Sequence, residues 1–161
     1  MDFDLNEEQS MIRDTARDFT YLAFDGFHVG ELQGEHLART VPRGRYVFLH
    51  GPSTDHNADL FRDGAMKSLR PLVERGDIKV VKEDRVRDYL AVEAERICNE
   101  ALAGGGGVDA VLAATDSIAA GAVKALAAHG LAGRVPVTRE NLDALLIDSG
   151  YLSRKAVYGG K

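Results

Sequence analysis

The chain contains 161 residues, of which 45% are hydrophobic and 28% charged, the usual balance of one soluble globular domain. No apolar run approaches the roughly 20 residues of a membrane-spanning helix, so we expect no membrane insertion. The net charge is −5, and residues 1–20 account for most of it, with six acids against two arginines. Because no cluster of Lys and Arg is present to contact phosphates, we expect no nucleic acid partner.

The first residues predict an acidic helix and not a signal peptide. They lack the basic start and the apolar stretch that export signals carry, so the chain as written is expected to stay in the cytoplasm. Asn6 is a suitable N-cap, and Gln9 three residues later completes a capping box. This pattern predicts a helix over 5–19.

From residue 21 onward, short apolar runs alternate with stretches of helical periodicity. An Asp25-Gly26 turn is expected to close the first run, and Pro71 to bend or restart a long helix. The predicted strands cover 21–24, 46–50, 78–81, 108–115 and 135–138. The predicted helices cover 29–38, 57–75, 89–103, 117–129 and 139–149. The expected domain boundaries are a helical extension over 1–20, one α/β domain over 21–152 and a loose tail over 153–161.

This alternation predicts a parallel sheet covered on both faces, a three-layer, doubly wound α/β fold with about five mostly parallel strands. In such sheets, ligands bind beyond the carboxyl ends of the strands. The first candidates for a site are therefore the residues that follow the strands, at 50–55, 84–89 and 115–117. Cys98, the single cysteine, lies in a helical pattern and is expected to be a packed hydrophobe.

Asp55 and Arg62 lie seven residues apart, so both project from one helix face if the helix has begun by Asp55. A carboxylate acceptor and a guanidinium donor suit a polyhydroxylated ligand. The alternative is that Asp55 caps the helix while Arg62 is a solvated charge, and spacing alone favours this alternative. Tyr89 follows the third strand, where an aromatic ring either stacks on a sugar or packs at the start of a helix.

Thr115, Asp116 and Ser117 stand where a strand leads into an Ala-rich helix. Asp116 or Ser117 is expected to cap this helix, and the same segment can form a polar hook toward the ligand crevice. The histidines show no metal-ligand spacing, the glycine run 104–107 precedes a strand instead of following one, and no nucleophile elbow occurs. We therefore expect no metal, no cofactor and no enzymatic activity.

The motifs VGELQ, DxNAxLFRxGxMKxLxP and GxIKVV occur in this order and are followed by VDAVLAATDSIAAGAV. Through them, residues 21–159 resemble the carboxy-terminal lobe of periplasmic xylose-binding proteins, the substrate-binding components of sugar ABC transporters. The resemblance implies one lobe of a type I periplasmic binding protein, which closes on a pentose between two lobes. It also implies that Asp55 and Arg62 contact the sugar. Tyr89 stands where the family has a stacking Trp, and Thr115 where it has a sugar-binding Asn. The candidate ligand-binding residues are thus Asp55, Arg62, Tyr89, Thr115 and Asp116.

Two parts of that family pattern have no counterpart in this chain. One is the amino-terminal lobe, and the other is the segment between the fifth strand and the last helix, which carries an Asp that holds sugar hydroxyls. Residues 1–19 resemble a different family, the opening helix of acyl-CoA dehydrogenases, through the pattern DFxLxEEQxxxxDxxRxF. That helix is structural in those enzymes, so it implies neither dehydrogenase activity nor a flavin. The chain is therefore expected to be a chimera.

The leading functional hypothesis is pentose binding by a single, truncated lobe. Because one lobe covers about one face of a sugar, the expected affinity is in the millimolar range, about −4 kcal/mol. Homodimerisation through the exposed face between the lobes would supply a second wall. The alternatives are a ligand-free interaction or structural module, the effector domain of a sugar-responsive repressor and, last, an enzyme.

Overall fold

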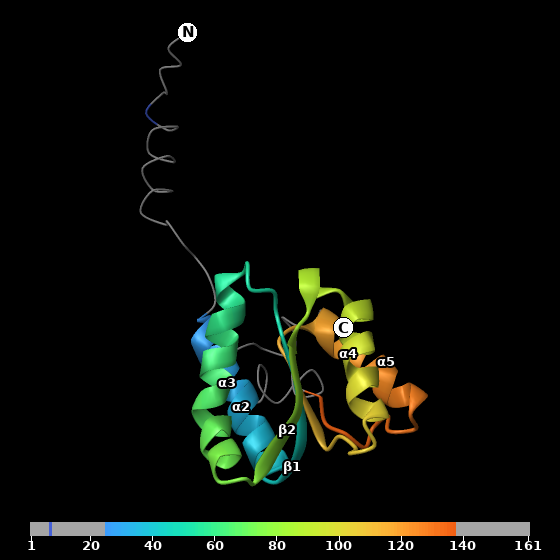
Figure 1. Ribbon diagram of the computed structural model, residues 1–161. Coiled ribbons are helices and arrows are strands. Elements are labelled where there is room, and N and C mark those ends of the chain that lie inside the picture. Colours follow the sequence, from blue (N-terminus) through green and yellow to red (C-terminus); the bar gives the residue numbers. More distant parts are fainter. Residues whose placement is uncertain (1–6, 8–24, 138–161) are drawn as a thin grey trace, which may run out of the picture.

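A parallel sheet forms the centre of the computed structural model, which describes Glu7 and residues 25–137 (Figure 1). Its strands are β1 (Gly44–His50), β2 (Ile78–Arg85) and β3 (Ala110–Ala113), in the order β2-β1-β3. Both outer strands pair with β1 in parallel, and an isolated parallel bridge between Val111 and Val137 continues the sheet beyond β3. Because β1 lies at the centre of the sheet with helices over both of its faces, its last five residues are all buried.

Within the described residues, helices cover both faces of this sheet. They are α2 (Gly26–Thr40) and α3 (His56–Glu74) on one face, and α4 (Ala91–Ala103) and α5 (Asp116–Ala128) on the other. A 3-10 turn, η1 (Arg87–Tyr89), joins β2 to α4. The three layers and the parallel crossovers confirm the predicted doubly wound α/β fold, with three strands and one bridge in the described part of the chain.

Alternate residues of β1 pack against opposite helix layers, as the two-residue period of a strand requires. Tyr46 and Phe48 share a core with α2 and α3, whereas Val47 and Leu49 share a core with α4 and α5. Cys98 lies in the second core, which confirms it as a packed hydrophobe. Burial raises the pKa of its thiol to about 12.

Helices α2 and α3 pack with their backbones in direct contact. A Cβ atom built on Gly30 would lie 2.1 Å from the Phe61 carbonyl oxygen, and one on Gly64 would lie 2.0 Å from the Phe27 carbonyl oxygen. A Cβ atom on Gly34 would lie 2.3 Å from the Ala65 carbonyl oxygen, also in α3. Glycine is therefore required at these positions by the close approach of two helices.

Two local predictions about helices are wrong. Asp25 and Gly26 form no turn, because the Asp25 side chain caps α2 by accepting a hydrogen bond from the His28 backbone N–H at 3.0 Å. The helix therefore begins earlier than the predicted 29–38. Of the bend or restart expected at Pro71, the restart is wrong: α3 continues through Pro71 to Glu74, since a proline near the C-terminal end removes only one hydrogen-bond donor.

The strand lengths also differ from the predictions. Strand β2 continues to Arg85 instead of ending near 81, because an edge strand tolerates the charged side chains that interrupt an apolar run. Strand β3 occupies only the centre of 108–115, and the described part of the predicted strand 135–138 shows only the bridge at Val137. The predicted helix 89–103 begins only after η1, at Ala91.

Several predicted elements lie outside the described residues. Apart from the helical and exposed Glu7, they are the helix over 5–19, the strand over 21–24, the helix over 139–149 and the tail over 153–161. The domain boundaries and the resemblance of residues 1–19 to acyl-CoA dehydrogenases therefore stay predictions. No described helix is both long and apolar enough to cross a bilayer.

Candidate functional site

The carboxyl ends of the three strands meet at one edge of the sheet, at the top of Figure 1. The loop after β1 carries Asp55, the turn after β2 carries Tyr89, and the loop after β3 leads to Ser117. Hydrogen bonds join these residues directly, so the structure brings together three segments that lie far apart in the sequence. We call Asp55, Tyr89 and Ser117 the edge cluster.

Asp55 is the N-cap of α3, and both of its carboxylate oxygens are engaged. Oδ1 accepts a hydrogen bond from the Asn57 backbone N–H at 2.9 Å, and Oδ2 accepts one from the Tyr89 hydroxyl at 2.5 Å. The Tyr89 hydroxyl, and after it the Asn57 N–H, holds the pKa of the Asp55 carboxyl below its usual value. Asp55 is thus the helix cap that the alternative hypothesis predicted, and it is also a charged acceptor at the carboxyl edge of the sheet.

Tyr89 reaches Asp55 because its backbone has an unusual conformation. Asp88 and Tyr89 both adopt positive φ values, 51° and 55°, which non-glycine residues seldom do. The ring lies over Gly51, where an added Cβ would come within 2.6 Å of Tyr89 Cε1 and 2.8 Å of the Ala58 Cβ. Burial, and then the Asp55 carboxylate, raises the pKa of the Tyr89 phenol to about 12.

The start of α5 differs from its prediction. Thr115, and not Asp116 or Ser117, is the N-cap, and its side chain accepts a hydrogen bond from the Ile118 backbone N–H at 3.5 Å. Asp116 is the first helical residue and is exposed. The Ser117 hydroxyl donates to the Tyr89 carbonyl oxygen at 2.7 Å, so the predicted polar hook contacts another loop of the edge.

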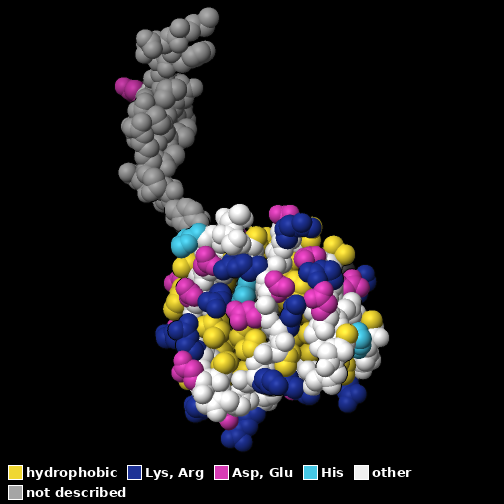
Figure 2. Space-filling model, viewed as in Figure 1, with side chains coloured by type: hydrophobic (Ala, Val, Ile, Leu, Met, Phe, Trp, Pro, Cys, Tyr) yellow, Lys and Arg dark blue, Asp and Glu magenta, His cyan; other side chains and the backbone are white. Residues whose placement is uncertain are grey.

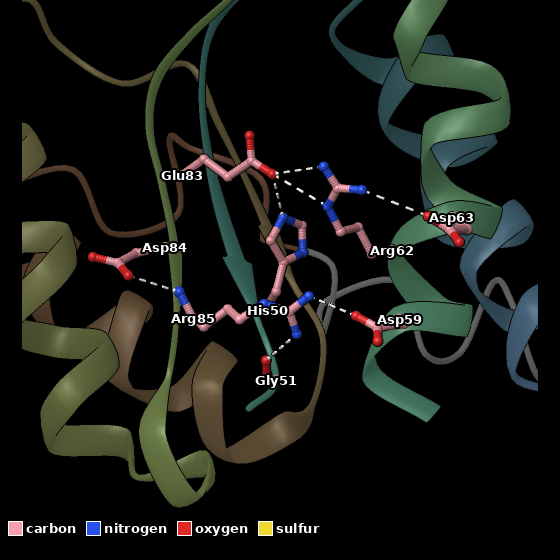
Figure 3. A network of polar contacts seen from close by, with 8 residues as sticks. All are labelled: His50, Gly51, Asp59, Arg62, Asp63, Glu83, Asp84 and Arg85. Atoms are coloured by element: carbon pink, nitrogen blue, oxygen red, sulfur yellow. Dashed lines mark hydrogen bonds and ion pairs between the residues drawn. The ribbon is translucent and has the colours of Figure 1, made fainter. Parts of the chain in front are cut away.

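Arg62 does not join the edge cluster. Its guanidinium donates to Glu83 Oε1 of β2 from Nε at 3.3 Å and from Nη2 at 3.2 Å. Its Nη1 also lies 3.5 Å from Asp63 Oδ1. Asp55 caps α3, and no contact joins it to Arg62 among the described residues; Arg62 is instead a partly exposed member of an ionic network with Glu83 and Asp63 (Figure 3).

His50 links that network to the core. Its side chain is only 5% exposed, and its Nε2 lies 3.0 Å from the same Glu83 oxygen (Figure 3). Burial lowers the pKa of His50, and with Arg62 and Arg85 it outweighs the opposing effect of Glu83. His50 is therefore neutral at pH 7 and donates its Nε2–H to Glu83. Although its own burial acts in the opposite direction, hydrogen bonds from His50 and Arg62 lower the pKa of Glu83.

Arg85, at the end of β2, and Glu83 were not among the predicted site residues. The Arg85 guanidinium donates to the Gly51 carbonyl oxygen at 3.2 Å and to Asp59 Oδ1 at 2.5 Å (Figure 3). The only available signal for Arg85 was its place within 84–89, directly after a predicted strand. Figure 2 shows acidic and basic side chains interspersed over this part of the surface.

Among the residues that the structure describes, no group of three or more His, Cys, Asp or Glu side chains is arranged to hold a metal ion. A surface hollow of about 370 Å³ lies away from the edge cluster, between β2 and the end of α4. It is lined by Lys79, Val80, Val81, Lys82, Glu100, Ala101, Gly104, Gly106 and Gly107. None of the predicted ligand-binding residues contributes to it.

Two curated relatives match most of this chain. It is 44% identical over 134 residues to the D-xylose-binding periplasmic protein of Escherichia coli K12, covering 83% of this chain and 40% of that protein. It is 42% identical over 138 residues to the protein of the same name from Haemophilus influenzae, covering 85% of this chain and 41% of that protein. The chain thus spans about two fifths of the length of these relatives.

Solved structures that resemble this chain are also solute-binding proteins. An ABC transporter periplasmic solute-binding protein from Actinobacillus succinogenes with bound D-allose is 26% identical, with a TM-score of 0.67, over 89% of this chain and 52% of that one. A solute-binding protein from Bacillus halodurans with bound myo-inositol is 25% identical, with a TM-score of 0.61, over 79% of this chain and 44% of that one. The model of the periplasmic binding protein domain matches residues 6–148. The chain therefore belongs to the periplasmic binding protein domain family.

Proposed function

We propose that this chain binds a pentose, with D-xylose as the first choice, and that the edge cluster forms one wall of the site. The observation that carries the proposal is the contact between Asp55 and Tyr89 at the carboxyl edge of the sheet. It places an ionised acceptor beside an aromatic ring, the two groups that recognise sugar hydroxyls and the C–H face of a sugar ring. The two relatives above are named for D-xylose.

The charge state of Asp55 supports this role. A carboxylate offers about four acceptor positions, and hydrogen bonds from Asn57 and Tyr89 occupy two of them. A sugar hydroxyl can therefore donate to Asp55 without breaking either bond. Thr115 and Asp116 flank the same edge as further polar candidates, whereas Arg62 needs to leave Glu83 in part before it can serve a ligand.

Thermal unfolding with added sugar tests the proposal. The sequence has no Trp, so calorimetry or a dye is preferable to intrinsic fluorescence. At 100 times the Kd, about 0.1 M for a millimolar site, D-xylose is expected to add about 2.7 kcal/mol of stability. Glucose and ribose serve as control sugars in separate melts.

Two variants identify the site in this assay. Asp55→Asn is expected to weaken the response to D-xylose, because the amide offers fewer acceptors than the carboxylate. Glu74→Gln removes a carboxylate at the far end of α3 and is expected to respond like the wild type. A cooperative melt with no response to D-xylose in any variant would overturn the proposal.

The second candidate function is a ligand-free interaction module. The observation that favours it is that the polar side chains at and beside this edge already pair within the chain: Tyr89 with Asp55, Arg62 with Glu83 and Arg85 with Asp59. In this case the chain is expected to melt cooperatively and to ignore sugars. Neither candidate function is enzymatic.

A homodimer is part of the first proposal. Leu90 and Val92 are 45% and 68% exposed directly after Tyr89, and a second copy packed against them would cover them and add a second wall to the site. Sedimentation velocity with and without D-xylose tests this, and Val92→Asp is expected to shift the species toward monomer. A single monomeric species at all concentrations would refute the dimer and leave sugar binding to the assay above.

A further inference from the structure

Tyr89 contacts the loops that follow all three described strands. Its hydroxyl donates to Asp55 beyond β1, its ring covers Gly51 at the end of β1, and its carbonyl oxygen accepts from Ser117 beyond β3. Tyr89 itself follows β2. One residue therefore fixes the spacing of three loops at the edge where a ligand is expected.

The backbone that carries Tyr89 needs support. Two successive non-glycine residues, Asp88 and Tyr89, have left-handed φ values of 51° and 55°. Such conformations cost free energy and persist only when neighbouring contacts hold them. The local backbone bonds are modest, from the Tyr89 N–H to the Val86 oxygen at 3.4 Å and from the Leu90 N–H to the Arg87 oxygen at 3.1 Å. The hydrogen bond from Ser117 to Tyr89 is shorter, 2.7 Å, and comes from outside the turn.

Helix capping does not explain Ser117. Thr115 already caps α5, and the Ser117 hydroxyl points to the Tyr89 carbonyl oxygen instead of to its own helix. We propose that Ser117 is a positioning residue, whose hydrogen bond to the Tyr89 carbonyl holds the left-handed turn and thereby aims the Tyr89 hydroxyl at Asp55. The effect on ligand affinity rests on the proposed function, whereas the effect on Tyr89 does not.

The direct readout is the Cζ resonance of Tyr89 in protein labelled with ¹³Cζ-tyrosine, measured at neutral pH without ligand. Tyr89→Phe assigns the resonance, and Asp55→Asn shows where it lies when the charged acceptor is gone. Ser117→Ala is expected to move it toward the Asp55→Asn position. Ser117→Thr keeps the hydroxyl and is expected to restore it.

Ser68→Ala is the matched control. It makes the same change on α3, at a serine whose hydroxyl has no hydrogen-bond partner among the described residues, and is expected to leave the resonance unchanged. In the same series, Ser117→Ala is expected to weaken D-xylose binding about fivefold, the usual loss for one neutral hydrogen bond.

The outcomes separate the two proposals. An unchanged Tyr89 resonance in Ser117→Ala overturns the positioning role, whether or not sugar binds. A shifted resonance that Ser117→Thr restores, in a protein that binds no sugar, supports the positioning role and refutes the proposed function. A shifted resonance with unchanged D-xylose affinity shows that Ser117 positions Tyr89 but that the ligand does not depend on this position. This result overturns the proposal that the edge cluster forms a wall of the sugar site.

Discussion

The backbone contact between α2 and α3 predicts that Gly64→Ala destabilises the fold. The new Cβ would lie 2.0 Å from the Phe27 carbonyl oxygen and 2.8 Å from the Glu31 nitrogen, both backbone atoms that no side-chain rotation can move aside. To lengthen the 2.0 Å contact to even 3.0 Å, the two helices have to separate by about 1 Å. Because the interior is closely packed, this separation also disturbs the neighbouring contacts.

Two opposing effects determine how much stability Gly64→Ala loses. Overpacking of this kind costs about 3 kcal/mol at the upper end of the usual range, since the obstacle is backbone. Replacing glycine by alanine within a helix returns about 1 kcal/mol through helix propensity. The net expectation is a loss of about 2 kcal/mol, which corresponds to a melting temperature lower by about 4–8 °C for a chain of this size.

Urea denaturation and calorimetry measure this loss. Gly106→Ala is the control, because a Cβ there would meet nothing within 4 Å and its φ is not positive. The control is expected to melt within about 2 °C of the wild type, as most exposed substitutions do. If Gly64→Ala melted at or above the wild-type temperature, helix propensity would outweigh packing and the inferred backbone contact would be wrong.

Three further predictions concern the edge and the core. Gly51→Ala is expected to displace the ring of Tyr89 from Asp55 and so to lower the phenol pKa from about 12, which absorbance at 295 nm follows; an unchanged titration would contradict the contact. Burial lowers the pKa of His50 in the fold, so its contribution to stability is present above the unfolded value near 6.5 and is lost as pH falls through the folded value. Unfolding of His50→Gln should depend less on pH than that of the wild type in this window, and equal slopes would argue against a buried neutral imidazole. Cys98, with a thiol pKa of about 12, should not react with a thiol reagent at pH 8 until urea unfolds the chain, and rapid labelling of the native protein would place it outside the core.

Much of the fold follows from local sequence patterns, and the errors lie where tertiary contacts decide. The apolar run at 46–50 predicted β1 because this strand is buried on both faces. The charged end of β2 was missed, since an edge strand does not need apolar residues at every position. The glycines of α2 are visible in the sequence, but only the structure shows that Gly30 and Gly34 lie against the backbone of α3, at Phe61 and Ala65.

For the proposed site, the rule about carboxyl ends predicted that Asp55, Tyr89 and Ser117 would lie at one edge of the sheet, while the partners of each residue needed the structure. Asp55 and Tyr89 lie 34 residues apart and meet at 2.5 Å, a contact that no spacing rule for helices or strands predicts. Arg62 was expected to share a helix face with Asp55, and only the structure shows that its hydrogen bonds go to Glu83. Arg85 had no motif to mark it, because an arginine that ends an edge strand looks like a surface charge.

The hydrogen-bond partners of Asp55 and Arg62 indicate how readily each side chain can bind a ligand. Asp55 keeps free acceptor positions, is held by a helix terminus and needs no rearrangement to accept a hydroxyl. Arg62 lies beside a partly exposed carboxylate that it would have to share, so its use by a ligand competes with the bond to Glu83. A preorganised group loses less on binding than one that must first be released. We therefore expect substitution of Asp55 or Tyr89 to weaken sugar binding more than substitution of Arg62, and the reverse order would move the site from the edge cluster to the ionic network beside it.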